Sequence, residues 1–324
     1  MGISRKLFLR VVLPAIAGFL IAGSAQAVYP ERSIMAIVPF APGGANDTIA
    51  RVLAPHLSRA IGQTVVIENR PGAAGNLGIE TVAKSAPDGY TLVFSATAST
   101  QNPALFKVMP FDPLKDIKPI AKIGEGPYVI AVNPKLPVNT LTELVEYARK
   151  NPGKLNAAAG GIGTRLSVEL FNLQNDLKIE IIPYDGTGPA SIAVLSGEAD
   201  LAIMDISAMI GNLQSGRIKP LAVAADRGLP SLPNTPTTTE AGLPRFKTGT
   251  LFGVYAQGNT PNDIVMKING AMNRVLAMPE VIEALRKLGV EPDPRTPEEF
   301  LRQYTAEIAQ WKEIVGRAKI PLME

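Results

Sequence analysis

The chain contains no cysteine among its 324 residues and only one histidine, His56. Disulfides, thiolate nucleophiles, iron–sulfur clusters and cysteine zinc sites are therefore excluded. The sequence also lacks a histidine cluster or densely spaced acidic residues, so we expect no metal site and no cofactor. His56 lies seven residues after Ile49 in a helical pattern, which predicts a residue packed in or beside the core.

Sequence patterns of the common catalytic machineries are missing as well. A serine triad would need His56 as its base, and no Gly-x-Ser-x-Gly segment occurs. The Gly-Lys-Ser/Thr of a phosphate-binding loop is also absent. We therefore predict that the protein is not an enzyme and name no catalytic residue.

A long apolar run occurs only at the N-terminus. Three basic residues, the last of them Arg10, precede the apolar segment Val11–Ala22, and Ala25-Gln-Ala27 forms a small-x-small cleavage site. The run is shorter than the ~20 residues that a membrane span needs. Residues 1–27 thus read as a secretory signal peptide cleaved after Ala27, and we expect the mature chain in the periplasm of a Gram-negative bacterium.

The excess of positive charge disappears with this leader. The full chain has 32 Lys and Arg against 29 Asp and Glu, and the leader carries three basic and no acidic residues. The mature chain then has equal numbers of each sign. Its charge gives no support for a nucleic-acid partner.

Strands and helices alternate through most of the mature chain, which predicts an α/β fold with βαβ crossovers and a mostly parallel sheet. A second such set follows Gly124–Pro127 and ends before a proline-rich stretch at 229–244. The tail then adds one strand and three helices, which need the first sheet to pack on. We predict two domains, with residues 28–123 plus 228–324 in the first and 124–227 in the second.

The segment Ser33–Ala50 is the first candidate binding element. An apolar strand at Ile34–Phe40 leads into Pro42-Gly43-Gly44, a tight turn, and a helix starts near Asn46 or Asp47. Unpaired N–H groups at a helix N-terminus favour an anion, because the helix dipole is positive there. The alternative is a tight turn that binds nothing.

The second predicted domain repeats this pattern. Leu155–Ala159 reads as a strand, Gly160–Gly163 as the turn, and Thr164 as a hydroxyl cap of the next helix. Two such turns, one in each domain, would direct two sets of amides into one interdomain cleft. The hydroxyl-rich segment Ala96–Thr100 follows the third strand, where a ligand crevice is expected in a doubly wound sheet.

Several segments together resemble one family, in this order and spacing: Tyr29-Pro-Glu-Arg-Ser33, Val38-Pro-Phe-Ala-Pro-Gly-Gly-Ala-Asn-Asp47, Glu68-Asn-Arg-Pro-Gly-Ala-Ala-Gly75, Ala86-Pro-Asp-Gly-Tyr-Thr-Leu92 and Leu195-Ser-Gly-Glu-Ala-Asp200. The chain is similar to the tripartite tricarboxylate transporter solute receptors, also called the Bug family, over essentially its whole mature length. The resemblance implies a type 2 periplasmic binding-protein fold, with two α/β domains that close over a small carboxylate for uptake by a membrane transporter. It implies transporter subunits as partners, and we expect a monomer.

The resemblance also implies a set of ligand contacts, namely Phe40, Ala41, Gly44, Ala45 and Asp47 in the first domain, Ser95, Thr97 and Ser99 beside them, and Gly160, Gly161, Thr164, Arg165, Tyr184 and Asp205 in the second. Asp47 would repel an anion, so it either caps its helix, which we favour, or meets a hydroxyl or amine of the ligand. Asp205 is open to the same two interpretations. Arg165 replaces the histidine of many members and either reaches the ligand or lies on the surface.

Two other functions stay open at this point. The receptor could report to a sensor or regulator instead of a permease. The same scaffold could also carry a periplasmic hydrolase or isomerase, and this idea fails if carboxylates bind and are recovered unchanged.

Overall fold

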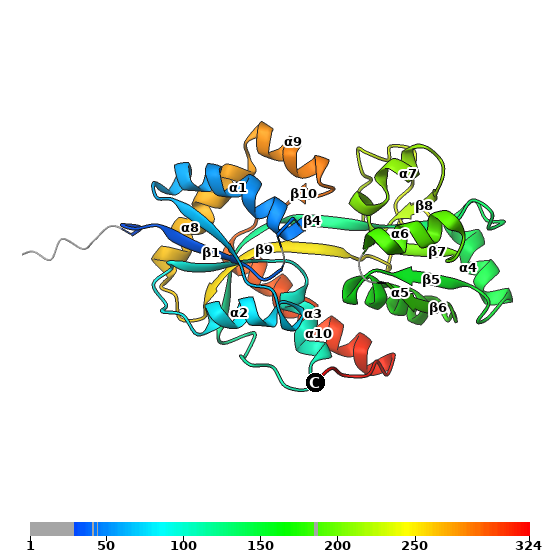
Figure 1. Ribbon diagram of the computed structural model, residues 1–324, viewed down its shortest axis with the longest axis horizontal. Coiled ribbons are helices and arrows are strands. Elements are labelled where there is room, and N and C mark those ends of the chain that lie inside the picture. Colours follow the sequence, from blue (N-terminus) through cyan, green and yellow to red (C-terminus); the bar gives the residue numbers. More distant parts are fainter. Residues whose placement is uncertain (1–28, 41, 44, 185–186) are drawn as a thin grey trace, which may run out of the picture.

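The computed structural model describes residues 29–324 except 41, 44, 185 and 186 (Figure 1). Two groups of helices and strands lie side by side and are joined by two long strands, β4 (Ile117–Val132) and β9 (Gly249–Gln257). We name the group that contains the first and last described residues lobe 1 and the other group lobe 2. The predicted signal peptide lies outside the described residues.

Lobe 1 is built from both ends of the chain. Its elements are β1 (Ile34–Val38), α1 (Ala45–Ile61), β2 (Val65–Asn69), the 3-10 turn η1 (Ala73–Gly75), α2 (Asn76–Ala83), β3 (Thr91–Ser95), α3 (Ala98–Leu105), α8 (Asn262–Leu276), α9 (Pro279–Lys287), β10 (Glu291–Pro292) and α10 (Pro297–Arg317). In Figure 1 the blue and cyan elements of the first hundred residues lie against the orange and red C-terminal helices.

Lobe 2 is formed by one continuous part of the chain. Its elements are α4 (Leu141–Lys150), β5 (Asn156–Ala159), α5 (Ile162–Asn175), β6 (Glu180–Pro183), α6 (Thr187–Ser196), β7 (Leu201–Asp205), η2 (Ile206–Ala208), α7 (Ile210–Gln214) and β8 (Lys219–Val223). The predicted single helix from Ile206 to Gln214 was wrong, because the chain breaks at Met209, whose φ of −125° is not helical.

β4 runs through both lobes without a break. Its first part pairs with β9 as far as Pro127, and its last five residues, from Tyr128, pair with β7 and β8. The segment Gly124–Pro127, after which we predicted the second set of strands and helices, therefore lies inside a strand. Its glycines serve close packing instead of a loop: a Cβ on Gly124 would lie 2.3 Å from the carbonyl oxygen of Glu291.

The sheet is mixed, which corrects the prediction of a mostly parallel sheet. The strand order is β2-β1-β3-β9-β4-β7-β5-β6, with β10 and β8 also paired to β4. The pairs β1–β2, β1–β3, β5–β6 and β5–β7 are parallel, whereas every described pair made by β4 or β9 is antiparallel. Two of these antiparallel pairs, β3–β9 and β4–β9, arise because β9 returns from the far end of the chain and inserts between β3 and β4.

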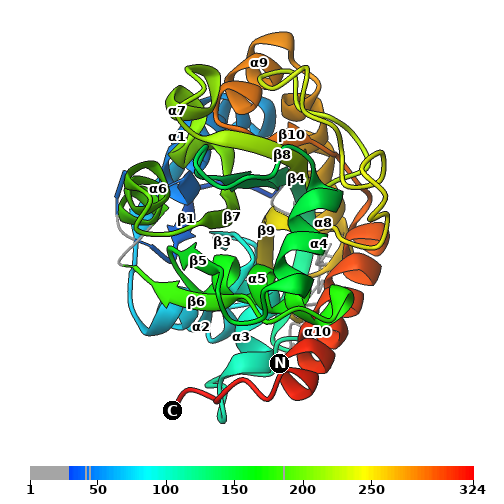
Figure 2. The same cartoon turned by 90° about the vertical axis from the view of Figure 1, so that its right-hand side faces the viewer.

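The last helix, α10, has the apolar face predicted from its sequence. Thr296 caps it in a reciprocal capping box with Glu299, and Phe300 and Tyr304 are fully buried. Its C-terminal half goes beyond the prediction: Trp311 belongs to the same apolar cluster as Phe171 of lobe 2. Figure 2 shows α10 beside α5, so this helix contacts both lobes.

The hydroxyl-rich segment after β3 begins a helix, α3, that the sequence did not predict. Thr97 precedes it, and the carbonyl of Thr97 accepts the first helical bond from the N–H of Gln101 at 2.8 Å. None of the described helices is both long and apolar enough to span a bilayer.

Candidate functional site

The second glycine turn leaves backbone amides available at the start of α5. Gly161 has a φ of +153°, a conformation that residues with a Cβ rarely adopt, and an added Cβ would meet no atom within 4 Å. The first bond of the helix runs from Arg165 N to Gly161 O at 3.0 Å. The N–H groups of Ile162, Gly163 and Thr164 precede that bond, so they have no partner within the helix.

The side chains around this second turn do not fill it. The Thr164 hydroxyl donates to the Gly161 carbonyl at 2.9 Å, so it does not occupy the free amides. Arg165 is exposed. Burial raises the pKa of Glu169, and the positive charge of the Arg165 guanidinium offsets part of that rise. The turn therefore combines open amides with a solvent-exposed cation.

In the first glycine turn, the N–H of Gly43 is bonded to a side chain. Asp47, which is 3% exposed, accepts the Gly43 N–H at 2.9 Å. Its carboxylate also accepts the Arg51 Nε–H at 2.9 Å from both oxygens, and the Asn69 amide at 2.9 Å. Asn69 donates a further bond to the Phe40 carbonyl at 3.0 Å and accepts one from Arg51 at 2.9 Å.

The carboxylate of Asp47 therefore bonds the amide of Gly43, in the turn before the helix, and its other bonds described here go to side chains and not to the amides of α1. Its bonds, above all that with Arg51, lower the pKa of Asp47 to about 2. Of the other contacts predicted here, Ala45 is the exposed first residue of α1, and Ala41 and Gly44 lie outside the described residues.

The predicted contacts in the β3–α3 segment lie next to Phe40. A Cβ on Gly75 would sit 3.1 Å from the Phe40 ring and 3.5 Å from Ala98, which places the ring against the start of α3. Ser95 and Ser99 are buried and both donate to the Ala96 carbonyl, at 3.2 and 3.1 Å. Their hydroxyl hydrogens are thus already used within lobe 1.

A polar cluster joins the two lobes beside the second turn. A Cβ on Gly163 would lie 2.9 Å from Tyr128 Oη of β4 and 3.5 Å from Gln101 Oε1 of α3. The start of α5 in lobe 2 therefore abuts α3 in lobe 1. This contact brings the second turn to the same region of the molecule as Thr97 and Ser99.

Asp205 belongs to this cluster, and its side chain does not cap the helix that follows, which was one of its two interpretations. Its carboxylate accepts from Thr250 Oγ1 at 3.0 Å, which also lies 3.3 Å from Tyr128 Oη, and it makes no side-chain bond to the amides of η2. Burial raises the pKa of Asp205. Asp205 and Thr250 thus tie β7 to the strand β9 that crosses between the lobes.

Tyr184 follows β6 and is half-buried against the apolar cluster of α6 and β7. Its hydroxyl donates to Glu198 Oε1 at 2.9 Å, within lobe 2. Gly160 is half-buried at the end of β5. Sequence reasoning missed Arg51, Asn69, Tyr128, Thr250 and Gln101; only Arg51 carried a signal, since it lies one helical turn after Asp47.

A cavity of about 630 Å³ is lined by both lobes, and of the predicted contacts it includes only Thr97. Thr250, Arg245, Glu307 and Trp311 also line it. Because the two glycine turns are absent from its lining, we do not assign the ligand site to this cavity. Among the described residues no group of three or more acidic or histidine side chains is placed to hold a metal ion.

Comparisons with known proteins decide the family. A family model described as "Tripartite tricarboxylate transporter family receptor" matches residues 49–320. The chain belongs to this family. Protein BugT of Bordetella pertussis is 35% identical over 319 residues, which cover 97% of this chain and 98% of BugT. The chain is thus similar to the Bug receptor over nearly its full length, as the sequence motifs predicted.

Solved structures agree. Rpa4515 of R. palustris, solved with adipate, has a TM-score of 0.77 at 34% identity and covers 91% of this chain and 100% of its own. MatC from Rhodopseudomonas palustris with bound malate has a TM-score of 0.74 at 33% identity, with 89% and 100% covered. The α/β periplasmic binding-protein fold is confirmed, and the protein is a periplasmic solute-binding receptor of the tripartite tricarboxylate family and not an enzyme.

Proposed function

We propose that this receptor captures a small organic carboxylate between its two lobes and delivers it to the membrane subunits of a tripartite tricarboxylate-type transporter. The observation that carries the proposal is the open N-terminus of α5, where the amides of Ile162, Gly163 and Thr164 face the region next to α3. A carboxylate is an acceptor that matches such amides. The adipate and malate in the two structural relatives support this ligand class.

The proposed contacts divide between the lobes. In lobe 2 the amides from Gly161 to Thr164 hold one carboxylate, with the exposed Arg165 adding positive charge. In lobe 1 the turn around Phe40 and Ala45 and the start of α3 at Thr97 contact the rest of the ligand. Asp47, Ser95, Ser99, Tyr184 and Asp205 shape the cleft through the internal bonds described above.

Closure of the two lobes is the proposed mechanism. The lobes move as the predicted domains, 28–123 plus 228–324 and 124–227, and bend about β4 and β9. Because the ligand contacts both lobes, it stabilises the closed arrangement over the open one. A micromolar affinity requires about 8 kcal/mol, which a few charge-assisted hydrogen bonds at ~1.5–3 kcal/mol each can supply once water is excluded.

Calorimetric titration of the mature chain, starting at Val28, tests the ligand class. The panel contains malate, adipate, citrate and a monocarboxylate, with the diamide of adipate as the matched uncharged control. We expect one site per monomer for at least one carboxylate, none for the diamide, and ligand recovered unchanged. Absence of binding across the panel, or equal binding of the diamide, would contradict the proposal.

Transporter coupling needs a separate test, because binding alone does not identify the partner. Membrane vesicles that contain the transporter subunits should accumulate the labelled ligand only when the loaded receptor is added. Capture of a sensor protein by the loaded receptor, without any uptake, would instead favour a signalling role.

A further inference from the structure

We propose that Arg51 is a positioning residue for ligand binding, which neutralises Asp47 and, together with Asn69, locks the first turn in its binding conformation. The inference rests on the proposed function, since it concerns how the first turn tolerates an anionic ligand. It assigns Arg51 no contact with the ligand itself.

The geometry shows a closed ring of bonds. Arg51 Nε lies 2.9 Å from both oxygens of Asp47, and Arg51 Nη2 donates to Asn69 Oδ1 at 2.9 Å. Asn69 in turn donates to Asp47 and to the Phe40 carbonyl, while Asp47 accepts the Gly43 N–H. The ring therefore holds the chain at Phe40, before the turn, and at Gly43, within it.

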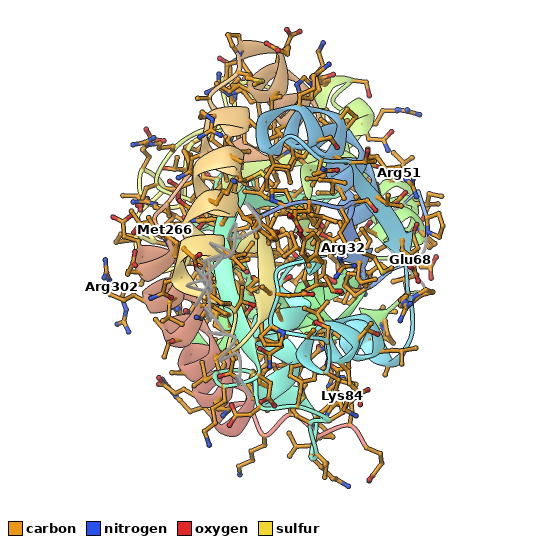
Figure 3. All side chains as sticks on the ribbon, turned by 90° about the vertical axis from the view of Figure 1, so that its left-hand side faces the viewer. Arg32, Arg51, Glu68, Lys84, Met266 and Arg302 are labelled. Atoms are coloured by element: carbon orange, nitrogen blue, oxygen red, sulfur yellow. The ribbon has the colours of Figure 1, made fainter. Side chains whose placement is uncertain are left out.

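The charges explain why the guanidinium is needed. Asp47 is buried beside the turn, and a bare carboxylate there would repel an incoming carboxylate. The planar guanidinium contacts both oxygens of Asp47 from the next turn of α1, so the pair carries no net charge. Arg51 is half-exposed, at 53% of its side chain, and Figure 3 shows it at the edge of lobe 1, on the same side as Glu68.

The ring also connects two of the sequence segments that identify the family. Asp47 ends the segment that starts at Val38, and Asn69 lies in the segment Glu68–Gly75. Residues that are 22 positions apart are thereby held in direct contact, because β1 and β2 are neighbours in the sheet and Val38 pairs with Asn69.

The test is a double-mutant cycle measured by calorimetric titration with malate. Arg51→Ala leaves Asp47 charged and unpaired, and we expect affinity to fall about tenfold. Asp47→Asn removes the negative charge but also weakens the ring, so it should lose less affinity than Arg51→Ala. The double variant Asp47→Asn/Arg51→Ala should recover most of the loss, and Arg51→Lys should lie between wild type and Arg51→Ala.

The salt dependence of malate affinity is a second measurement, and it would not change if Arg51 had a purely structural role. The loss of affinity in Arg51→Ala should become smaller as sodium chloride is raised from 0.05 to 0.5 M. The screening length falls from about 14 to about 4 Å over this range, and the repulsion is electrostatic. Arg32→Ala, which removes another exposed ion pair of lobe 1, with Asp88, is the matched control and should leave affinity unchanged.

If wild type binds malate, two results would overturn the inference and leave the proposed function standing. In the first, the double variant binds malate no better than Arg51→Ala. In the second, the loss of affinity in Arg51→Ala is independent of salt. A wild-type protein that binds no carboxylate would contradict the proposed function itself. If Arg51→Ala fails to fold, as judged by thermal melting, Arg51→Gln replaces it in the cycle and in the salt series, because it removes the same charge, and the same two results would then overturn the inference.

Discussion

The two glycine turns have similar sequences but opposite chemistry. At the first, Asp47 reaches back to the Gly43 amide, and Arg51 neutralises it. At the second, Thr164 occupies the equivalent part of the helix, but its hydroxyl donates to a carbonyl and leaves the amides open. A strand–glycine–helix pattern therefore does not by itself define an anion site.

This difference separates two roles within one cleft. The second turn offers donors to a ligand, whereas the described part of the first turn is a prearranged wall whose charges cancel internally. Variants at each turn should therefore fail in different ways: those at the second turn in ligand affinity, and those at the first in acid stability and in the salt dependence of binding.

The largest effect is expected for Gly161→Val. The φ of +153° strains any residue with a Cβ, and the side chain would project into the open space before the α5 amides. We expect malate affinity to fall by at least about 100-fold in calorimetric titration.

Gly216→Val is the matched control for this variant. Gly216 also has a positive φ, of +71°, and open space around it, but it lies in the turn after α7. It should lower the melting temperature and leave affinity unchanged. Equal losses of affinity in the two variants would mean that strain, and not the position of Gly161, determines binding.

Acid stability should distinguish the first turn. The pKa of Asp47 is lowered to about 2 in the folded protein, below its ordinary value of 3.8, so its stabilisation is present above about pH 4 and is lost as the pH falls through 2. This loss amounts to about 2 kcal/mol in wild type and should be absent in Asp47→Asn. Urea unfolding between pH 2 and 5 measures it.

Asp88→Asn is the control for the acid experiment, because Asp88 forms an exposed ion pair with Arg32. It should follow the wild-type curve. If Asp47→Asn loses stability in acid as steeply as wild type, the bonds around Asp47 do not stabilise the fold.

A moderate effect is expected for Arg165→Gln. Arg165 is exposed in the first turn of α5, and its removal should weaken malate binding by about three- to tenfold at low salt. Arg217→Gln, an exposed arginine before β8, should have no effect. An unchanged affinity in Arg165→Gln would assign this side chain to the surface alone.

The smallest signal is spectroscopic. Trp311 is the single tryptophan of the chain and shares an apolar cluster with Phe171 of α5, the helix whose other end carries the second turn. Malate should shift Trp311 emission in wild type, and not in Gly161→Val. Saturating ligand without any change in emission would show that α5 and α10 keep their contact during binding.

The sequence predicted the helices with one apolar face, the two glycine turns and the family, because each of these depends on residues close together in the chain. It could not predict that β4 is continuous through Gly124–Pro127, because only the neighbouring strands reveal why glycine is needed there. The insertion of β9 between β3 and β4 depends on pairing over more than a hundred residues.

The candidate site shows the same limit. Asp47 was identified, yet its bonds could not be predicted, because one partner, Asn69, comes from another strand. Thr250, the partner of Asp205, lies 45 positions away and could not be predicted from the residues near Asp205 in the sequence either. Polar residues could be located from sequence, but their partners required the fold.

The position of β9 also has a consequence for how the protein is made. The sheet neighbours of β9 in lobe 1, β3 and β4, are synthesised long before it. Their edges therefore stay unpaired until the last quarter of the polypeptide emerges. Lobe 2, a continuous segment, can assemble by itself in the meantime. A newly exported molecule should therefore acquire its central lobe first, and its N-terminal third should remain sensitive to protease until the C-terminus arrives.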